Sequence, residues 1–459
     1  MSGTHQSVHG LWSSRMAFIL AATGAAVGLG NIWKFPYMMG QNGGGAFVLV
    51  YLFCILLIGI PVMMAEVMIG RRGRQSPGYS VKALAIEAKA STKWQIAGWS
   101  GLVASYLILS FYAVIAGWAL SYVFKGVAGE FDSLTAESSA TLFGTFISDS
   151  AALLFWSTLI LLATVLVVGK GVHKGLEKAV SYLMPALFLL VIVMAVYAAF
   201  NGAFAQAADF MFRPDFSKLT MNGVLLALGH AFFSLSLASG AMIIYGAYLP
   251  SDISIAKTSL CIALIDTTVA LLAGIAIYPL VFGYGLEPGE GPGLIFVTLP
   301  IAFGEMPFGA LFGTLFFIML GFAAFTSAIA MIESTVAWLV ESKGFSRWMA
   351  TILSGCSLWF VSLLTVYSFT GASWTQFEIT VLGKTIHNFF EAIDYLTSAI
   401  MLPLGGLLIA LFAGWVMKQQ VTQEELRIRS AGYFLWRFGI RWFTPVAIIA
   451  VFLNLIGII

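Results

Sequence analysis

The chain has 459 residues, of which 60% are hydrophobic and 10% are charged, and its formal net charge at pH 7 is +2. A water-soluble fold of this length could not bury so much apolar surface, so the composition excludes a soluble globular protein and predicts a polytopic membrane protein. The small net charge gives no indication of nucleic-acid binding. The cysteines (Cys54, Cys261 and Cys356) lie in apolar runs without metal-ligand spacing, so neither a zinc site nor a disulfide framework is expected.

Apolar stretches of about 20 residues or more, long enough to cross a bilayer, recur along the whole chain. We predict an all-α polytopic membrane protein in which residues 1–459 form a single transmembrane domain with eleven transmembrane helices. Their approximate ranges are 15–39, 44–70, 95–124, 151–169, 177–200, 223–249, 255–284, 308–341, 347–368, 388–417 and 434–458. The first range is too long for a cleavable signal peptide and leads directly into the second, so we expect it to be a true span.

The charges of the predicted loops indicate the orientation, because cytoplasmic loops carry an excess of Lys and Arg. Cations gather after the second, fourth and tenth spans: Arg71, Arg72, Arg74, Lys82, Lys89 and Lys93; Lys170, Lys174 and Lys178; Lys418, Arg427, Arg429, Arg437 and Arg441. The intervening loops are poor in cations or acidic, as at Glu130, Asp132, Glu137, Asp149, Glu287 and Glu290. With an odd number of spans, the amino terminus is expected in the cytoplasm and the carboxyl terminus outside.

The first span contains Gly24, Gly28 and Gly30, followed by Asn31. Glycine weakens a helix. Within lipid, an interrupted helix is tolerated only where its freed backbone groups face protein or a wet cavity, and there these groups can bind ions or substrate. The alternative is a close-packing motif in which the small residues Gly24 and Gly28 let a neighbouring helix approach.

A second interruption is predicted in the sixth span, where Ser234, Ser236 and Ser239 precede Gly240. Four spans separate it from the first, as expected if two five-helix halves, about 15–200 and 223–417, repeat with inverted topology and each begin with a broken helix. The span at 434–458 is then an extra helix. This pairing favours a transporter over an enzyme. Exposed amides suit a carboxylate and unwound carbonyls suit an ammonium group, so the expected substrate is a zwitterionic amino acid.

Asp266 is a lone carboxylate inside the seventh span. Intramembrane ionisable groups are costly and are functional by default. Sodium is a hard cation that prefers several oxygen ligands, which unwound carbonyls, hydroxyls and one carboxylate supply. One alternative is a protonated or amide-paired structural aspartate. Another is an intramembrane aspartyl protease that pairs Asp266 with Asp394, although the Gly-x-Gly-Asp context of such enzymes is missing. An ion channel is expected to show repeated filter sequences, and none is evident.

Residues 24–36, 41–47, 59–71, 232–240 and 323–327 carry a resemblance that extends over nearly the whole chain. The sequence resembles the neurotransmitter:sodium symporter family, in particular its bacterial amino-acid transporters with the leucine-transporter fold. The resemblance implies sodium-coupled symport of a neutral amino acid by alternating access in the lipid bilayer of a bacterial inner membrane. No obligatory protein partner is evident. The alternative substrate is an ω-amino acid or a taurine-like or betaine-like solute, which Ser239 and Lys34 favour.

Carried over residue by residue, the resemblance implies two sodium sites and one substrate site. The first sodium site would use Ala26, Asn31, Ser234 and Asp266. The second would use Gly24, Val27, Ala323, Thr326 and Ser327. The substrate site would comprise Ala25, Ala26, Leu29, Gly30, Ile108, Tyr112, Phe233, Ser234, Ser236, Ser239, Ser327 and Met331. Within it, Tyr112 is expected to bond the substrate carboxylate and Phe233 to close over the site.

The resemblance also implies two gates and a pattern of ion use. The outer gate would contain Lys34, Asp394 and His230, and the inner gate His9, Glu341 and Tyr248. Glu66 is expected to brace the broken first helix by accepting hydrogen bonds from its freed amides. Animal members of the family balance charge with chloride, whereas the fixed carboxylate of Asp266 can do so here. No chloride requirement is therefore expected.

Overall fold

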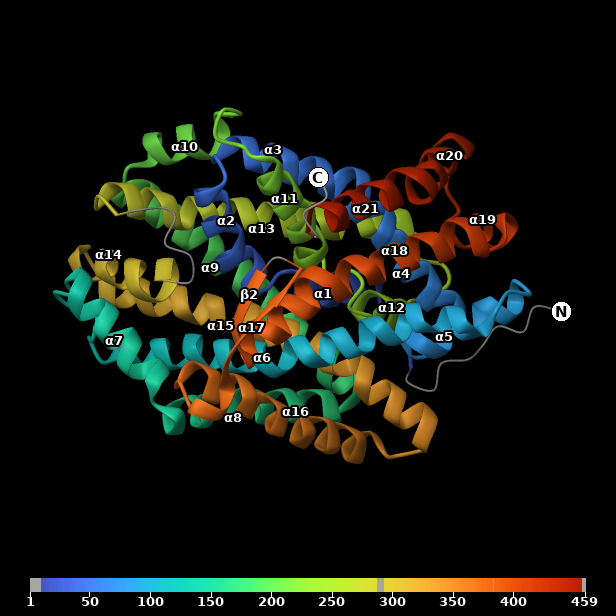
Figure 1. Ribbon diagram of the computed structural model, residues 1–459, viewed down its shortest axis with the longest axis horizontal. Helices are drawn as coiled ribbons and strands as arrows, with labels where there is room; N and C mark the ends of the chain where they lie inside the picture. Colours follow the sequence, from blue (N-terminus) through green and yellow to red (C-terminus); the bar gives the residue numbers. More distant parts are fainter. Residues whose placement is uncertain (1–9, 287–292, 383, 456–459) are drawn as a thin grey trace.

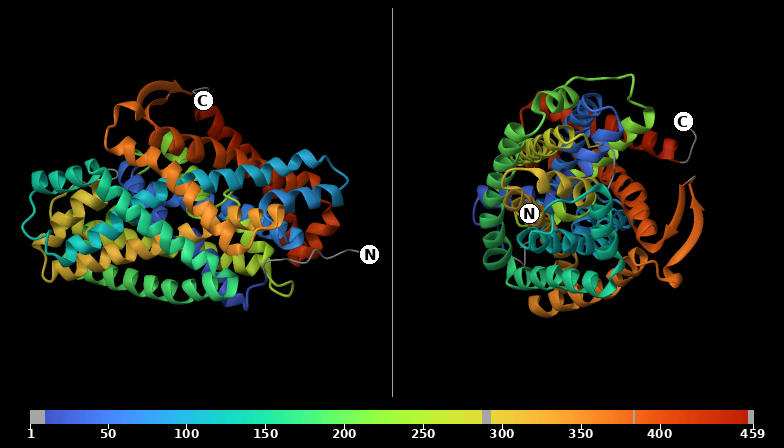
Figure 2. Two further views of the ribbon diagram at one scale, coloured as in Figure 1. Left: turned by 90° about the horizontal axis from the view of Figure 1, so that it is seen from below. Right: turned by 90° about the vertical axis from the view of Figure 1, so that its left-hand side faces the viewer.

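The computed structural model describes residues 10–286, 293–382 and 384–455. These residues form a bundle in which most long helices run along the longest axis of the molecule (Figure 1). The predicted helical class is confirmed, with the addition of one antiparallel hairpin, β1 (Gln376–Val381) and β2 (Lys384–Asn388). Figure 2 shows this hairpin as orange arrows at the surface of the bundle.

The loop at residues 213–220 separates the helices into a first half and a remainder, close to the predicted start of the second repeat at about 223. The first half forms α1 (Arg15–Ala26), α2 (Phe35–Gln41), α3 (Gly45–Cys54), α4 (Ile60–Gly73), α5 (Pro77–Glu87), α6 (Ile96–Val127), α7 (Ala136–Ser148), α8 (Ser150–Gly169), α9 (Lys178–Asn201) and α10 (Phe204–Phe212). The remainder forms α11 (Met221–Ser234), α12 (Ala241–Ala247), α13 (Ile255–Gly283), α14 (Leu299–Glu305), α15 (Gly309–Lys343), α16 (Arg347–Phe369), α17 (Phe389–Asp394), α18 (Leu402–Leu411), α19 (Gln419–Leu426), α20 (Ser430–Phe438) and α21 (Thr444–Leu455).

Short segments of tighter or wider helix connect several of these elements. They are η1 (Gly30–Lys34), η2 (Ile55–Gly59), η3 (Thr92–Gln95), η4 (Val172–Glu177), η5 (Leu294–Thr298), η6 (Ser373–Thr375), η7 (Tyr395–Met401), η8 (Phe412–Val416) and η9 (Gly439–Phe443). Most are π-helical, with an i to i+5 hydrogen-bond pattern that is uncommon in proteins and often found near functional sites. One of them, η1, directly follows the glycine-rich part of the first predicted span.

Among the described residues, nine helices are long and apolar enough to cross a membrane. They are Gly45–Gly73, Thr92–Val127, Ser150–Gly169, Val172–Asn201, Ile255–Gly283, Gly309–Lys343, Arg347–Phe369, Phe389–Val416 and Ser430–Asn454. The pair Arg15–Ala26 and Gly30–Gln41, bent by 50°, makes ten if it counts as one span. The remaining predicted span, 223–249, falls on the short helices α11 and α12. The count of eleven and the inverted repeats stay predictions.

Both predicted interruptions are present in the backbone. We call residues 27–29 the first break, because α1 ends at Ala26 and Val27 adopts an extended conformation (φ −68°, ψ 104°). Residues 235–240 form the second break, between α11 and α12. Within it, Ser236, Ala238 and Gly240 have φ values of +51°, +58° and +78°. These left-handed values cannot continue a right-handed helix, so the helix is interrupted there.

Glycine allows α4 to contact α12 through the backbone. A Cβ atom on Gly70 would lie only 1.8 Å from the carbonyl oxygen of Ile243, and a Cβ atom on Gly246 would lie 2.6 Å from the carbonyl oxygen of Val67. No side chain fits between the two helices at these points. The helix that follows the second break is therefore held directly against α4.

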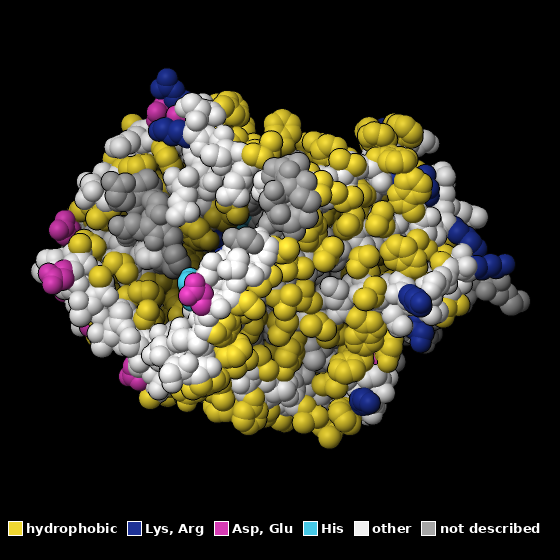
Figure 3. Space-filling model, in the orientation of Figure 1, with side chains coloured by type: hydrophobic (Ala, Val, Ile, Leu, Met, Phe, Trp, Pro, Cys, Tyr) yellow, Lys and Arg dark blue, Asp and Glu magenta, His cyan; other side chains and the backbone are white. Residues whose placement is uncertain are grey.

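Charged side chains are separated along the long axis. On the face seen in Figure 3, most Lys and Arg side chains lie at the end formed by α5 and α19, and Asp and Glu side chains mark the end formed by α7 and α14. A broad hydrophobic surface lies between them. A lipid bilayer would cover such a surface and leave both charged ends in water.

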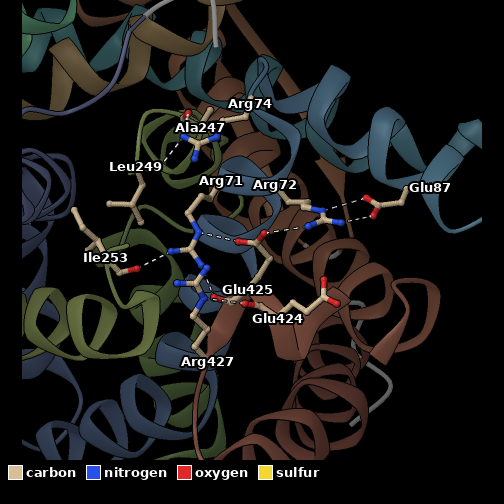
Figure 4. A network of polar contacts seen from close by, with 10 residues as sticks. All are labelled: Arg71, Arg72, Arg74, Glu87, Ala247, Leu249, Ile253, Glu424, Glu425 and Arg427. Carbon is tan, nitrogen blue, oxygen red and sulfur yellow. Dashed lines mark hydrogen bonds and ion pairs between the residues drawn. The ribbon is translucent and has the colours of Figure 1, made fainter. Parts of the chain in front are cut away.

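At the basic end, ion pairs join α4 to α5 and α19 (Figure 4). Arg71 Nε lies 2.8 Å from Glu425 Oε2, and Arg72 Nη2 lies 2.5 Å from Glu87 Oε1. Arg71 Nη1 also donates to the carbonyl oxygen of Ile253, at 2.6 Å, in the loop that follows α12. Arg74 Nη1 donates to the carbonyl oxygen of Leu249 in the same loop, at 2.7 Å. The end of α4 thus fixes both this loop and α19.

The Gly70→Ala substitution is expected to destabilise the protein by about 2 kcal/mol or more, because the added methyl group would collide with the backbone of α12. Thermal unfolding of the purified protein in detergent measures the effect. Gly321→Ala in α15 is the matched control, since nothing lies within 4 Å of the added Cβ atom there. Equal unfolding temperatures for the two variants would contradict the close contact.

Candidate functional site

A cavity of about 410 Å³ lies between the two breaks. We call it the central cavity. It is lined by Ala25, Ala26, Gly28, Gly30, Ser105, Ile108, Tyr112, Phe233, Ser236, Ser239, Ser327, Met331 and Leu402. All of the predicted substrate residues except Leu29 and Ser234 are in this lining. The structure therefore brings most of the predicted substrate site together, from α1 and η1 on either side of the first break, from α11 and the second break, and from α6 and α15.

The two exceptions lie next to the central cavity. Leu29 lines a neighbouring cavity, and its backbone N–H donates to the hydroxyl of Tyr112 at 3.2 Å. Ser234 belongs to a polar cluster around Asp266. Three lining residues, Gly28, Ser105 and Leu402, are not in the predicted substrate site, although Gly28 belongs to the predicted interruption of the first span. The spacing of Ser105, three residues before Ile108, could have placed it on the same helix face, whereas no local signal indicates Leu402.

Glycine at position 28 keeps part of the central cavity open. A Cβ atom there would lie 2.6 Å from Ser327 Oγ and 2.8 Å from the hydroxyl oxygen of Tyr112. Any other residue would displace these two hydroxyls. Because the hydroxyls come from α15 and α6, Gly28 lets both helices present a polar group to the first break.

The predicted side chains of the first sodium site form one hydrogen-bonded cluster. Asp266 is fully buried, and its carboxylate accepts from Asn31 Nδ2 at 2.8 Å and from Ser234 Oγ at 2.6 Å. Asn31 Nδ2 also lies 3.1 Å from Ser234 Oγ, and Asn31 Oδ1 accepts from the N–H of Gly28 at 3.1 Å. The cluster thus joins the first break, α11 and α13.

Tyr51 of α3 is a further member of this cluster that sequence analysis missed. Its hydroxyl lies 3.1 Å from Ser234 Oγ and 3.5 Å from Asp266 Oδ2. A tyrosine in an apolar helix gives no local signal for such a role. Its position depends on the packing of α3 against α11.

No ion pair reaches the Asp266 carboxylate from the part of the chain that the structure describes. An ionised carboxylate that is buried without a cation is strongly unfavourable. The cluster is therefore suited to a small bound cation. It also fits the alternative of an amide-paired structural aspartate, because Asn31 Nδ2 donates to the carboxylate.

The predicted second sodium site also comes together, between α1 and α15. Ser327 Oγ lies 3.2 Å from the carbonyl oxygen of Gly24 and 3.4 Å from that of Val27. Thr326 bonds to its own helix, at 3.1 Å from the carbonyl oxygen of Ala323, which is ordinary for threonine. Ser327 instead reaches across to α1, so its hydroxyl joins the two elements at the first break.

The described residues contain no group of three or more His, Cys, Asp or Glu side chains that could hold a metal ion. Carbonyl, amide and hydroxyl oxygens with one carboxylate remain as ligands, and they suit a hard cation of low charge.

The expectation for Glu66 was wrong. Its Oε1 atom accepts a hydrogen bond from the N–H of Ala238, at 2.6 Å, so it braces the second break and not the first. In the first break, the N–H groups of Gly28 and Leu29 are bound by Asn31 and Tyr112. The sequence could not distinguish the two cases, because which break Glu66 contacts depends on the packing of α4 against segments that are distant in the sequence.

Of the three predicted outer-gate residues, Lys34 and Asp394, but not His230, line a second cavity of about 650 Å³ that shares Phe233 and Tyr112 with the central one. No ion pair joins Lys34 to Asp394 within the described residues. Lys34 Nζ lies 4.7 Å from the ring centre of Phe233, and Asp394 accepts from Ser398 Oγ at 2.9 Å. The Phe233 ring therefore stands between the two cavities with a cation over it.

His230 is buried close to this gate, and its ring stacks on Phe35 at 5.7 Å between ring centres. Neither ring nitrogen has a hydrogen-bond partner among the described residues. Asp394, the other carboxylate considered for a protease, lines the second cavity, whereas Asp266 lies in its own cluster. No contact joins the two carboxylates in the described part of the chain, so the geometry gives no support to an aspartyl dyad.

At the inner gate, His9 lies outside the described residues. Glu341 accepts from the N–H of Ser76 at 2.8 Å. The hydroxyl of Tyr248 donates to Glu333 at 2.6 Å, and Glu333 forms an ion pair with Arg347 at 2.5 Å. Sequence analysis missed this pair, although an acidic residue inside a predicted span is itself a signal.

Comparison with known proteins shows clear similarity over nearly the full length. The sequence model described as the Sodium:neurotransmitter symporter family matches residues 9–142 and 141–458. The uncharacterized sodium-dependent transporter YhdH of Bacillus subtilis (strain 168) is 38% identical over 453 residues, which are 98% of each chain. The sodium- and chloride-dependent GABA transporter 2 of Rattus norvegicus is 24% identical over 498 residues, covering 96% of this chain and 79% of that protein. The crystal structure of MhsT in complex with L-phenylalanine has a TM-score of 0.89 and 41% identity, covering 97% of this chain and 99% of that chain.

Tyr51→Phe is expected to raise the sodium concentration needed for half-maximal stabilisation about fivefold, because one hydrogen bond that orients Ser234 and Asp266 is lost. Thermal unfolding at increasing sodium chloride, with total ionic strength held constant by potassium chloride, measures this midpoint. Tyr122→Phe is the matched control, since its buried hydroxyl has no partner among the described residues. Equal midpoints would contradict the role of Tyr51. No sodium-dependent stabilisation at all would support the structural aspartate.

Proposed function

This chain belongs to the sodium:neurotransmitter symporter family, and from that premise we propose that it is a symporter that takes up a neutral amino acid together with sodium by alternating access. As a member of this family it is a sodium-dependent transporter with several membrane-spanning helices. The observation that carries the proposal is the fully buried Asp266 carboxylate, held by Asn31 and Ser234 beside the peptide groups that the two breaks free.

The imbalance of charge in this cluster supports the binding of sodium. A sodium ion next to Asp266 would offset the cost of the buried carboxylate, and the carboxylate of an amino-acid substrate would then bring a second negative charge to the same ion. Each ligand would bind more tightly in the presence of the other, which is the reciprocal coupling that symport requires. We assign the second sodium ion to the carbonyl and hydroxyl oxygens of Gly24, Val27, Ala323, Thr326 and Ser327.

The lining of the central cavity supports a substrate with a neutral side chain. None of the lining residues is Lys, Arg, His, Asp or Glu, so a charged substrate side chain would lie there unpaired. The hydroxyl of Tyr112 and the peptide groups of the first break suit the carboxylate of a zwitterion. The similar protein MhsT was crystallised in complex with L-phenylalanine, which supports an amino acid here.

An ω-amino acid or a taurine-like or betaine-like solute is the second candidate. Ser239 favours it, because a serine in the lining makes the cavity more polar. Lys34, the other residue that suggested it, is not among the lining residues and lies over the ring of Phe233. An α-amino acid is therefore the better supported substrate class.

Alternating access requires two barriers that open in turn. We assign one barrier to Phe233 with Lys34, between the central and second cavities. We assign the other to Tyr248, Glu333 and Arg347, where the ion pair joins α15 to the start of α16. The basic end of the molecule contains Arg71 and its partners, which supports a cytoplasmic amino terminus in a bacterial inner membrane, with the carboxyl terminus outside.

Proteoliposomes with an inward sodium gradient are expected to accumulate a radiolabelled neutral amino acid above its external concentration. Replacing sodium with potassium should reduce this uptake to the level of empty liposomes, and Asp266→Ala should do the same. Asp209→Ala is the matched control, because that carboxylate is exposed in α10. Equal uptake in sodium and potassium would contradict sodium coupling.

Chloride is expected to be dispensable, because the Asp266 carboxylate supplies a fixed negative charge beside the proposed ion. Replacing all chloride with gluconate at constant sodium should leave the initial rate of uptake unchanged. Loss of uptake in gluconate, restored by chloride, would show that the fixed carboxylate does not balance the ion.

A further inference from the structure

The serine hydroxyls in the central cavity all direct their protons to backbone carbonyl oxygens. Ser105 Oγ donates to the carbonyl oxygen of Ser239 at 2.6 Å, Ser239 Oγ to that of Ser236 at 2.7 Å, and Ser236 Oγ to that of Ala25 at 2.6 Å. Ser327 Oγ likewise lies 3.2 Å from the carbonyl oxygen of Gly24. A hydroxyl has one proton and two lone pairs. Each serine therefore uses its proton on the backbone and offers a ligand only lone pairs.

Tyr112 differs from these serines. Its hydroxyl oxygen accepts a hydrogen bond from the N–H of Leu29 at 3.2 Å, and its hydroxyl also bonds that of Ser327. Because the Ser327 proton points to a backbone carbonyl oxygen, the proton between these two hydroxyls is that of Tyr112, and a ligand carboxylate can compete with Ser327 for it. Ser105 lies seven residues before Tyr112 on α6, which separates them by about 10 Å along the helix axis. The central cavity thus has a donating end at Tyr112 and an accepting end at Ser105 and Ser239.

Ser105 and Ser239 cannot easily turn their hydroxyl protons from the backbone to a ligand. If Ser105 or Ser239 turned to donate to a ligand, it would leave a carbonyl oxygen of the second break without its hydrogen bond in a buried position. An unsatisfied buried acceptor is unfavourable. The N–H of Ala241 lies 3.4 Å from Ser239 Oγ, a long contact that still leaves a lone pair free. Ile108, Met331 and Leu402 supply apolar surface in the same lining.

From this polarity we propose that the preferred substrate is a neutral amino acid whose mainly apolar side chain carries an N–H or O–H donor, which Ser105 and Ser239 accept. The inference rests on the proposed function and specifies its substrate. The substrate carboxylate lies at the donating end and its side chain points to the accepting end. Side chains that only accept hydrogen bonds, or that carry a negative charge, meet oxygen lone pairs and are disfavoured.

Near-isosteric amino-acid pairs test this inference on the purified full-length protein in sodium buffer. L-tryptophan is compared with 3-(3-benzothienyl)-L-alanine, in which sulfur replaces the indole N–H, and L-tyrosine is compared with 4-fluoro-L-phenylalanine, in which fluorine replaces the phenolic hydroxyl. Dissociation constants are measured by isothermal titration calorimetry. We expect the donor-bearing member to bind about fivefold more tightly in each pair that binds, the ratio expected for one hydrogen bond.

Alanine substitutions test whether Ser105 and Ser239 are the groups that accept the hydrogen bond from the substrate side chain. Ser105→Ala and Ser239→Ala should each reduce the ratio of the two dissociation constants within a pair toward one. The affinity for the member without a donor should change little, which shows that the variant is correctly folded. Ser110→Ala is the matched control on α6, because its hydroxyl bonds the carbonyl oxygen of Leu107 and it is not among the cavity residues. It should leave the ratio unchanged.

The outcomes separate the two proposals. Equal affinity within both pairs, or tighter binding of the member without a donor, overturns the inference and leaves sodium-coupled amino-acid transport standing. A ratio that survives Ser105→Ala and Ser239→Ala overturns the assignment to these serines. If none of the four compounds binds in sodium and no other neutral amino acid does so, the proposed function fails, and the inference fails with it.

Discussion

The organisation of this protein depends on a fully buried carboxylate, that of Asp266, which receives hydrogen bonds from Asn31 and Ser234 but has no cationic side chain beside it within the described residues. In a membrane such a group is costly unless it is neutralised. The side chains around it are the amide of Asn31 and the hydroxyls of Ser234 and Tyr51. In the proposed mechanism, a cation that enters from solution would offset this cost, and the same ion would attract the carboxylate of a substrate. The need for a partner ion thus links the fold to transport.

The two breaks are possible in lipid because other side chains satisfy the peptide groups that they free. Asn31 and Tyr112 bind amides of the first break, and Glu66 binds an amide of the second. The serine hydroxyls of the central cavity donate hydrogen bonds to carbonyl oxygens. Among the cavity hydroxyls that the structure describes, the serines then offer a ligand lone pairs, and the hydroxyl proton of Tyr112 is not used on the backbone. The groups that stabilise the breaks therefore also determine what the cavity can bind.

Much of this arrangement could be predicted from the sequence, because its signals are local. The glycines near Asn31 and the serines before Gly240 indicated both breaks, and most residues expected around the substrate lie in one cavity. Groups whose roles depend on packing between distant helices could not be predicted. Glu66 was assigned to the wrong break, and Tyr51, Leu402 and the partnership of Glu333 with Arg347 were missed. Local patterns in the sequence indicate where a helix is interrupted. Only the packed structure shows which side chain binds the peptide groups that the interruption frees.

The most direct test of this account is a high-resolution structure of the protein determined in sodium with a bound amino acid. We predict a sodium ion in direct contact with the Asp266 carboxylate and with peptide oxygens of the first break, next to the substrate carboxylate. The ion should be lost when sodium is replaced by potassium. The account would be contradicted by a bound substrate with no ion at Asp266, or by continuous helices across residues 27–29 and 235–240.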